Sequence, residues 1–183
     1  GEGGGEAREI GHGAIAIAAV TSCTTATDTR MMLACGLVAQ KAAAAGLSPK
    51  PWVKTILAPG SKATELLLER AGLMEGLRSL GFHTCGFGCM SCIGNSGPVV
   101  DALHDVADEI ELASVLSGNR NFEGRISPDV SQNYLAAPAM VVAYALAGTM
   151  DIDLAHDALG AREDGVPVHL ADIWPTDAEI DAL

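Results

Sequence analysis

Short apolar runs alternate along this chain with longer segments in which apolar residues recur every three to four positions. The first run, residues 14–20, contains only alanine, isoleucine and valine. It is too short for a typical helix, so it predicts a buried strand. The same reasoning predicts strands at residues 52–57, 82–86 and 112–116. Helical periodicity predicts helices at residues 29–45, 62–71, 75–80 and 134–147, each followed by a glycine that can end it. In the last of these helices, Pro138 is expected in an early turn or at a break.

Strands that alternate with helices are typical of an α/β fold. Right-handed crossovers give a mainly parallel sheet, so we expect a three-layer α/β/α arrangement with helices on both faces. Ligands of such sheets bind beyond the carboxyl ends of the strands. Candidate functional residues follow three predicted strands at that edge, namely Cys23, then Cys89 with Cys92, then Arg120. Three separate segments are therefore expected to converge on one site.

The length of 183 residues corresponds to one domain or a little more. Residues 1–13 begin with a glycine-rich stretch, and we interpret them as a flexible lead-in or linker. The core domain is expected at residues 14–160, and the acidic residues 161–183 are expected to form a C-terminal extension toward a linker. Because the sequence has no initiator methionine, we expect it to be part of a longer chain.

The chain is acidic, with 11 lysines and arginines against 23 aspartates and glutamates and a net charge of −12. This charge repels phosphate backbones and argues against general binding to nucleic acids or anionic membranes. The longest apolar run, residues 135–147, is shorter than the roughly 20 residues of a membrane span, and no basic segment leads into a signal core. We therefore expect a cytoplasmic protein without a membrane partner.

Five cysteines are an odd number for a disulfide framework, which favours a reducing compartment. Cys89 and Cys92 form a Cys-x-x-Cys pair that can bind one metal ion or cluster, and one distant cysteine would complete a three-thiolate site. Structural zinc would need a fourth ligand, namely Cys85, Cys35 or a histidine. A redox pair or unreactive thiols are equally compatible with the spacing. Cys35 itself lies on the packed face of its helix, where it is expected to be a small buried residue.

Arg120 and Arg125 lie five residues apart in a polar segment that follows a predicted strand. Two guanidinium groups in a loop can bind carboxylates through paired hydrogen bonds. Surface arginines are more often solvated or paired with a nearby acid, and Asn119 and Asn121 can equally be turn residues. The five histidines show neither the spacing nor the clustering of a metal site.

Distinctive sequence blocks run from about residue 14 to residue 180. They are Ser22-Cys23-Thr24, Trp52-Val53-Lys54, Leu57-Ala58-Pro59-Gly60-Ser61, Gly86-Phe87-Gly88-Cys89, Cys92-Ile93-Gly94-Asn95-Ser96-Gly97-Pro98, Leu116-Ser117-Gly118-Asn119-Arg120-Asn121-Phe122-Glu123-Gly124-Arg125, Asn133-Tyr134-Leu135-Ala136 and Asp172-Ile173-Trp174-Pro175. In these blocks the chain resembles the aconitase family, in its aconitase A and iron regulatory protein branch. The resemblance implies the fold of the third, cluster-bearing domain of those proteins, or of a fragment of it.

The resemblance also implies a cofactor. In the family, three cysteines hold a 4Fe-4S cluster, and they match Cys23, Cys89 and Cys92 in this chain. Three thiolates leave one iron with open coordination positions, where it can act as a Lewis acid toward a substrate hydroxyl and carboxylate. This is the chemistry by which the family isomerises citrate and isocitrate through cis-aconitate.

Substrate-binding residues follow from the same resemblance. The family's carboxylate-binding arginines match Arg120 and Arg125, and the asparagine that supports the cluster matches Asn119. The acid–base groups of the complete enzymes come from further domains, and nothing in this chain matches them. The remaining domains are therefore expected in cis or as separate chains, and the isolated chain is expected to be inactive.

One departure from the family pattern concerns the segment around the first cysteine. The family usually has an asparagine after Ser-Cys-Thr, where this chain has Thr25 followed by Ala26. Related substrates of the 2-methylcitrate or homocitrate type thus stay open. RNA binding is the rival from another class, because iron regulatory proteins without a cluster bind an RNA hairpin in the same cleft, but the net charge of −12 argues against it. A domain that has lost its cluster and acts as a scaffold is a third alternative.

Overall fold

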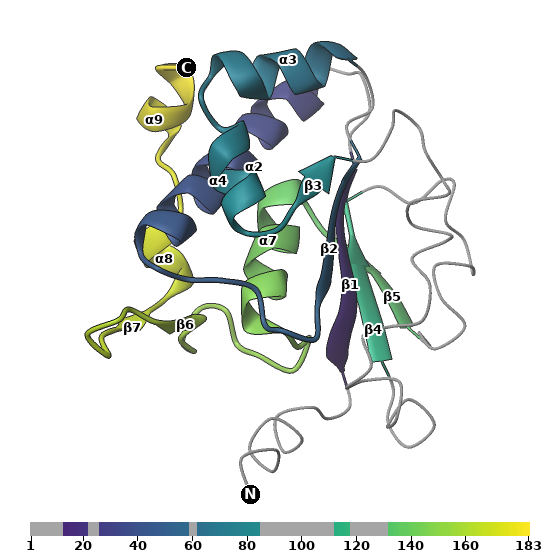
Figure 1. Ribbon diagram of the computed structural model, residues 1–183, viewed down its shortest axis with the longest axis vertical. Helices are drawn as coiled ribbons and strands as arrows, with labels where there is room; N and C mark the ends of the chain where they lie inside the picture. Colours follow the sequence, from purple (N-terminus) through teal and green to yellow (C-terminus); the bar gives the residue numbers. More distant parts are fainter. Residues whose placement is uncertain (1–12, 22–25, 59–61, 85–111, 118–131) are drawn as a thin grey trace, which may run out of the picture.

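A computed structural model describes residues 13–21, 26–58, 62–84, 112–117 and 132–183 of the chain (Figure 1). Within these residues the strands are β1 (Ala14–Thr21), β2 (Lys54–Ala58), β3 (His83–Thr84), β4 (Leu112–Leu116), β5 (Gln132–Leu135), β6 (Gly160–Ala161) and β7 (Pro167–Val168). The helices are α2 (Ala26–Ala44), α3 (Lys62–Arg70), α4 (Met74–Ser79), α7 (Pro138–Ala147), α8 (Leu170–Ile173) and α9 (Asp177–Asp181).

Five parallel strands form the main sheet, in the order β3-β2-β1-β4-β5. β1 is the central strand, and its side chains from Ala14 to Val20 are at most 1% exposed. Both faces of β1 are thus covered, which explains why its sequence is a continuous apolar run and not an alternating one. The chain moves outward from β1 to β2 and β3, and it returns to the other side of β1 for β4 and β5. The strand order therefore reverses between β1 and β4, as in doubly wound sheets.

The helices α2, α4 and α7 lie on one side of this sheet (Figure 1). α7 contacts β1 and β4, and α2 packs against α7 and α4. Small residues allow the close approach, since a Cβ added to Gly76 of α4 would lie 2.8 Å from the Cα of Gln40 in α2. Cys35 of α2 is fully buried, as the sequence predicts, and burial raises the pKa of its thiol to about 12.

The expected α/β class and its parallel sheet are confirmed. β4 has the predicted bounds, and α2, α3 and α4 end near glycines with φ between 73° and 88°, namely Gly46, Gly72 and Gly81. These are left-handed conformations, which glycine adopts without steric cost. The described helices α2, α4 and α7 cover one face of the sheet, and the second helical layer of the expected three-layer arrangement stays a prediction.

The predicted helix over residues 134–147 is wrong at its N-terminal end. Residues 132–135 form strand β5, in which Tyr134 lies opposite Val115 of β4. Helix α7 begins only at Pro138, after Ala137 in an extended conformation. Proline lacks an N–H to donate and disfavours helical geometry in the residue before it, so it stands at the start of the helix. Gly148 ends α7 as predicted, with φ of 76°.

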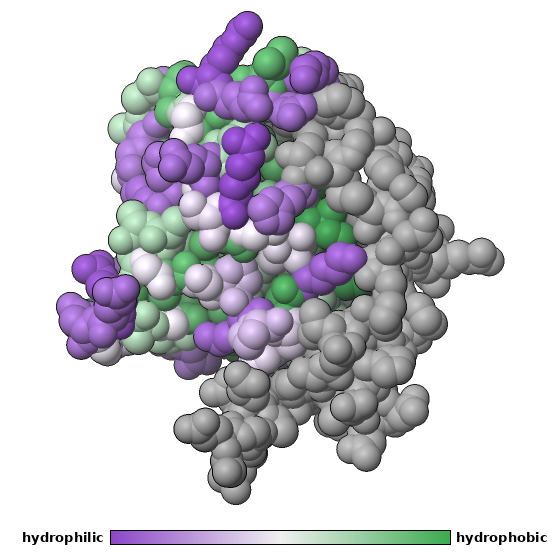
Figure 2. All heavy atoms as spheres, in the orientation of Figure 1, coloured by the Kyte–Doolittle hydropathy of each residue, from purple (hydrophilic) through white to green (hydrophobic). Residues whose placement is uncertain are grey.

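The C-terminal residues lie against α2. β6 and β7 form an antiparallel hairpin, and α8 and α9 both contact α2. The charged tip of the hairpin, residues 162–164, contributes to the hydrophilic surface at the left of Figure 2. Ile173 and Ile180 are buried, whereas Trp174 is 41% exposed. The isoleucines, and not the tryptophan, are therefore the main apolar anchors of this segment.

Ion pairs also connect α9 with α2. Nη1 of Arg30 lies 2.6 Å from Oδ1 of Asp181, and its Nη2 lies 2.9 Å from Oδ1 of Asp177. Nζ of Lys41 lies 2.8 Å from Oε1 of Glu179. These groups are accessible to solvent, so salt screens their attraction.

A hydrogen bond between two surface residues, His156 and Asp153, depends on pH. Nδ1 of His156 lies 2.7 Å from Oδ2 of Asp153. Their hydrogen bond raises the pKa of His156 and lowers the pKa of Asp153. The contribution of His156 to the stability of the fold is complete below its unfolded pKa, and it is lost as pH rises through its raised folded pKa. The contribution of Asp153 to the stability of the fold is present above its unfolded pKa, and it is lost as pH falls through its lowered folded pKa.

We therefore expect Asp153→Asn to lower the pKa of His156 toward its ordinary value. An NMR pH titration of the His156 ring measures this shift. Asp164→Asn removes the same charge from the hairpin tip and serves as the control, with the pKa of His156 unchanged. An equal pKa in the Asp153→Asn variant and the original chain would contradict the contact.

Candidate functional site at the carboxyl edge of the sheet

The carboxyl ends of the parallel strands meet at one edge of the sheet. Thr21 ends β1 opposite Ala58, which ends β2. Thr84 ends β3 opposite Leu57 of β2, and Leu116 ends β4 within two residues of the end of β1 in register. The chain that follows each of these strands therefore starts from the same edge. In doubly wound sheets this edge holds the ligand, at the point where the strand order reverses.

Ser117 joins β1 and β4 at that point. Its N–H donates to the carbonyl of Ala19 at 3.2 Å. Its hydroxyl accepts a hydrogen bond from the Thr21 N–H at 2.7 Å and donates to the Thr21 carbonyl at 2.6 Å. The ends of β1 and β4 are thus bound to each other immediately before residues 22–25 and 118–131.

All the site residues predicted from the sequence lie outside the described residues: Cys23, Cys89, Cys92, Asn119, Arg120 and Arg125. The structure gives the starting points of their segments. Thr21 precedes Cys23 by two residues, and Ser117 precedes Asn119 by two residues. Cys85, whose role the sequence leaves open, also lies outside the described residues and directly follows β3.

Sequence reasoning named Ser117 only within the block of residues 116–125, and it missed the contact with Thr21. A serine between a buried strand and a glycine is a weak signal, because such positions commonly hold turn residues. Only the pairing of β1 with β4 gives this hydroxyl its two partners.

Within the described ranges, no three histidine, cysteine, aspartate or glutamate side chains gather closely enough to hold a metal ion. Cys35 is enclosed by the core, so it is not available as the fourth ligand of a zinc site. Among the helices of the described residues, none has both the length and the apolar character needed to cross a bilayer.

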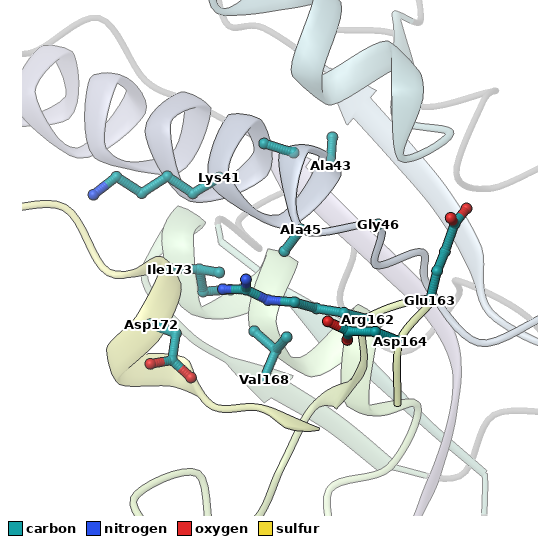
Figure 3. Close-up of a pocket in the computed structure, with 11 residues that line it drawn as sticks. Lys41, Ala43, Ala45, Gly46, Arg162, Glu163, Asp164, Val168, Asp172 and Ile173 are labelled. Atoms are coloured by element: carbon teal, nitrogen blue, oxygen red, sulfur yellow. The ribbon is translucent and has the colours of Figure 1, made fainter. Parts of the chain in front are cut away.

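A hollow of about 860 Å³ lies at the other end of α2, where the last turn of the helix meets the β6–β7 hairpin and α8. Figure 3 shows the Arg162 side chain extended across it, toward Ile173. Lys41 also lines the hollow, but its ammonium group is paired with Glu179. As a crossover helix, α2 runs from the carboxyl end of β1 back to the start of β2, so this hollow is remote from the carboxyl edge.

Comparison with known proteins finds similar sequences over nearly the whole chain. The profile of the aconitase family (aconitate hydratase) matches residues 3–148. Aconitate hydratase A of Streptomyces viridochromogenes is 54% identical over 178 residues, which are 96% of this chain and 19% of the relative. Aconitate hydratase A of Corynebacterium efficiens is 55% identical over 174 residues, 94% of this chain and 19% of the relative. Phosphinomethylmalate isomerase of Streptomyces viridochromogenes is 57% identical over 181 residues, 98% of this chain and 20% of the relative.

The chain spans about one fifth of the length of these curated relatives. The family profile covers most of the chain, from before β1 to the end of α7. It includes β1 and β4, the strands that meet at the reversal point of the sheet. On these grounds the chain belongs to the aconitase family.

Proposed function

We propose that this chain is the cluster-bearing part of a hydro-lyase of the aconitate hydratase type, which isomerises citrate and isocitrate through cis-aconitate. The observation that carries the proposal is that β1 and β4 end side by side. These strands lead to Cys23 and to the Asn119–Arg120 segment, and Ser117 binds them together at the reversal point of the sheet. Family membership and an identity of 54% to an aconitate hydratase A support the same reaction class.

The donor set of the chain fits a 4Fe-4S cluster. Cys23, Cys89 and Cys92 offer three thiolates, which are the usual ligands of such clusters. Cys23 follows β1 by two residues, so its segment starts at the edge where doubly wound sheets bind ligands. When bound, the cluster supplies an iron with open coordination positions that acts as a Lewis acid.

The other residues of the proposed site bind the substrate. The guanidinium groups of Arg120 and Arg125 form paired hydrogen bonds with substrate carboxylates. A net charge of −12 repels a tricarboxylate at long range, so its binding depends on such local cations. The amide of Asn119 supports the cluster side of the site. Acid–base groups come from the remaining aconitase domains, in cis or as separate chains.

A second candidate function has support from one comparison. The identity to phosphinomethylmalate isomerase is 57%, at least as high as the identity to the two aconitate hydratases described above. Thr25 also departs from the asparagine that is usual beside the first cysteine of aconitases. A substrate in which a phosphinate replaces a carboxylate would suit the same arginine pair, because both groups are oxyanions.

Anaerobic reconstitution with iron and sulfide tests the cofactor. We expect a broad absorption band near ~400 nm and about four irons per chain. A colourless protein that binds zinc or no metal after this treatment would contradict the proposal.

Hybrid enzymes test the substrate. The chain replaces the matching segment of the Streptomyces viridochromogenes aconitate hydratase A in one hybrid, and of its phosphinomethylmalate isomerase in a second. We expect the first hybrid to isomerise citrate at a rate within tenfold of its parent, which is within ~1.4 kcal/mol in activation free energy. Activity of the second hybrid alone would favour phosphinomethylmalate. Both parents, prepared in the same way, are the controls.

A further inference from the structure

The hydrogen bonding between β1 and β4 changes at the carboxyl ends of the two strands. The Ser117 N–H donates to the Ala19 carbonyl, which is a regular rung between parallel strands. Two residues further along β1, the Thr21 N–H donates to the hydroxyl of Ser117 at 2.7 Å. The same hydroxyl donates to the Thr21 carbonyl at 2.6 Å. One side chain thus binds both polar backbone groups of Thr21, beyond the last regular rung.

The geometry of a strand makes this double contact possible. The N–H and the C=O of one residue point toward the same neighbouring strand, so a single hydroxyl can accept from one and donate to the other. An alanine at position 117 offers neither group. A threonine keeps the hydroxyl.

The contact lies between two segments that the proposed function requires. Cys23 follows Thr21 by two residues, and Asn119 follows Ser117 by two residues. β1 and β4 are also the pair between which the strand order reverses. We propose that Ser117 is a positioning residue, which holds the start of the Cys23 segment at a fixed separation from the start of the Asn119–Arg120 segment. The inference rests on the proposed function for its consequence in catalysis, but the contact itself does not.

Ser114 provides a matched control on the same strand. It is fully buried, and its hydroxyl donates to Oδ1 of Asn133 at 2.5 Å, on the side of β5. Ser114→Ala therefore removes a serine hydroxyl and a hydrogen bond from β4 without touching β1. Both alanine variants are expected to lower the thermal midpoint, so stability alone does not separate them.

The first measurement uses the reconstituted chain. The visible band is followed after a chelator is added, in the original protein and in Ser117→Ala, Ser117→Thr and Ser114→Ala. Ser117→Ala removes both hydrogen bonds of the hydroxyl, and we expect it to lose its band at least about five- to tenfold faster, the change that one hydrogen bond of ordinary strength would give. Ser117→Thr and Ser114→Ala are expected to follow the original protein.

The second measurement uses the protein without iron. Alkylation of Cys23 by iodoacetamide is timed by peptide mass spectrometry, and Ser117→Ala is expected to raise its rate by a similar factor. If the original chain takes up no cluster, the proposed function fails, while a faster Cys23 reaction in Ser117→Ala alone still supports the positioning role. If Ser117→Ala matches Ser114→Ala in both measurements, the positioning role is overturned.

Discussion

Replacing Cys23 by serine is expected to abolish the 4Fe-4S cluster of the reconstituted chain. A serine hydroxyl is protonated at neutral pH and is a poor ligand for iron, whereas a cysteine beside a metal is bound as the thiolate. Two of the three proposed ligand cysteines would remain, and they cannot hold three of the irons. We expect about four irons per chain in the original protein and a loss of most of them in Cys23→Ser, together with the band near ~400 nm. Iron counting and visible absorption measure both effects.

Cys35→Ala is the matched control for that variant. Cys35 is fully buried in the core, and burial raises the pKa of its thiol to about 12. It is therefore a neutral thiol at pH 7 and has no access to iron, so its removal should leave the iron count unchanged. Full iron in Cys23→Ser, or its loss in Cys35→Ala, would contradict the assignment of the ligands.

Gly148→Ala is expected to cost the fold about 2–5 kcal/mol in free energy of unfolding, from a strained backbone and an overpacked core. Gly148 has φ of 76°, a left-handed conformation that is unfavourable for alanine. A Cβ at this position would collide with the Lys50 side chain and would lie 2.9 Å from Cζ2 of Trp52. The carbonyl of Gly148 also accepts hydrogen bonds from the Ile15 N–H at 2.9 Å and from Nε1 of Trp52 at 3.0 Å. A shift of the backbone would weaken both bonds.

Gly72→Ala separates the two causes. Gly72 has φ of 73°, but a Cβ there would meet no atom within 4 Å. It should therefore show only the conformational cost, roughly 1 kcal/mol. Urea unfolding followed by circular dichroism compares the two variants. Equal losses would mean that the contacts of Gly148 with Lys50 and Trp52 do not matter.

Local patterns predicted most of the described elements. The continuous apolar run of β1 reflects burial on both faces, and glycines after α2, α3 and α4 reflect the left-handed residues that end these helices. The error at residues 134–135 has a local cause as well. Tyr134 and Leu135 continue the apolar pattern of α7, and only Pro138 separates the strand from the helix. Reading Pro138 as a first helical residue would have placed the boundary correctly.

The residues of the candidate site differ in whether the sequence could identify them. The cysteines and arginines were proposed from sequence motifs, and the resemblance to the family assigned their roles, which stay predictions. The partner of Ser117 could not be found in that way. Its contact with Thr21 joins residues 96 positions apart, and it exists only because β4 returns to the side of β1 that β2 leaves free.

Residue order alone thus predicted the α/β class and most helix ends correctly, because each depends on neighbours within a few positions. It also supplies the candidate metal-binding and carboxylate-binding residues, which stay predictions. The order of the strands, the meeting of β1 and β4 at the reversal point and the docking of α9 on α2 belong to the folded chain. These features depend on contacts between distant segments, such as Arg30 with Asp177 over 147 positions. Such contacts form only when burial of a shared core brings the segments together, and no local periodicity encodes them.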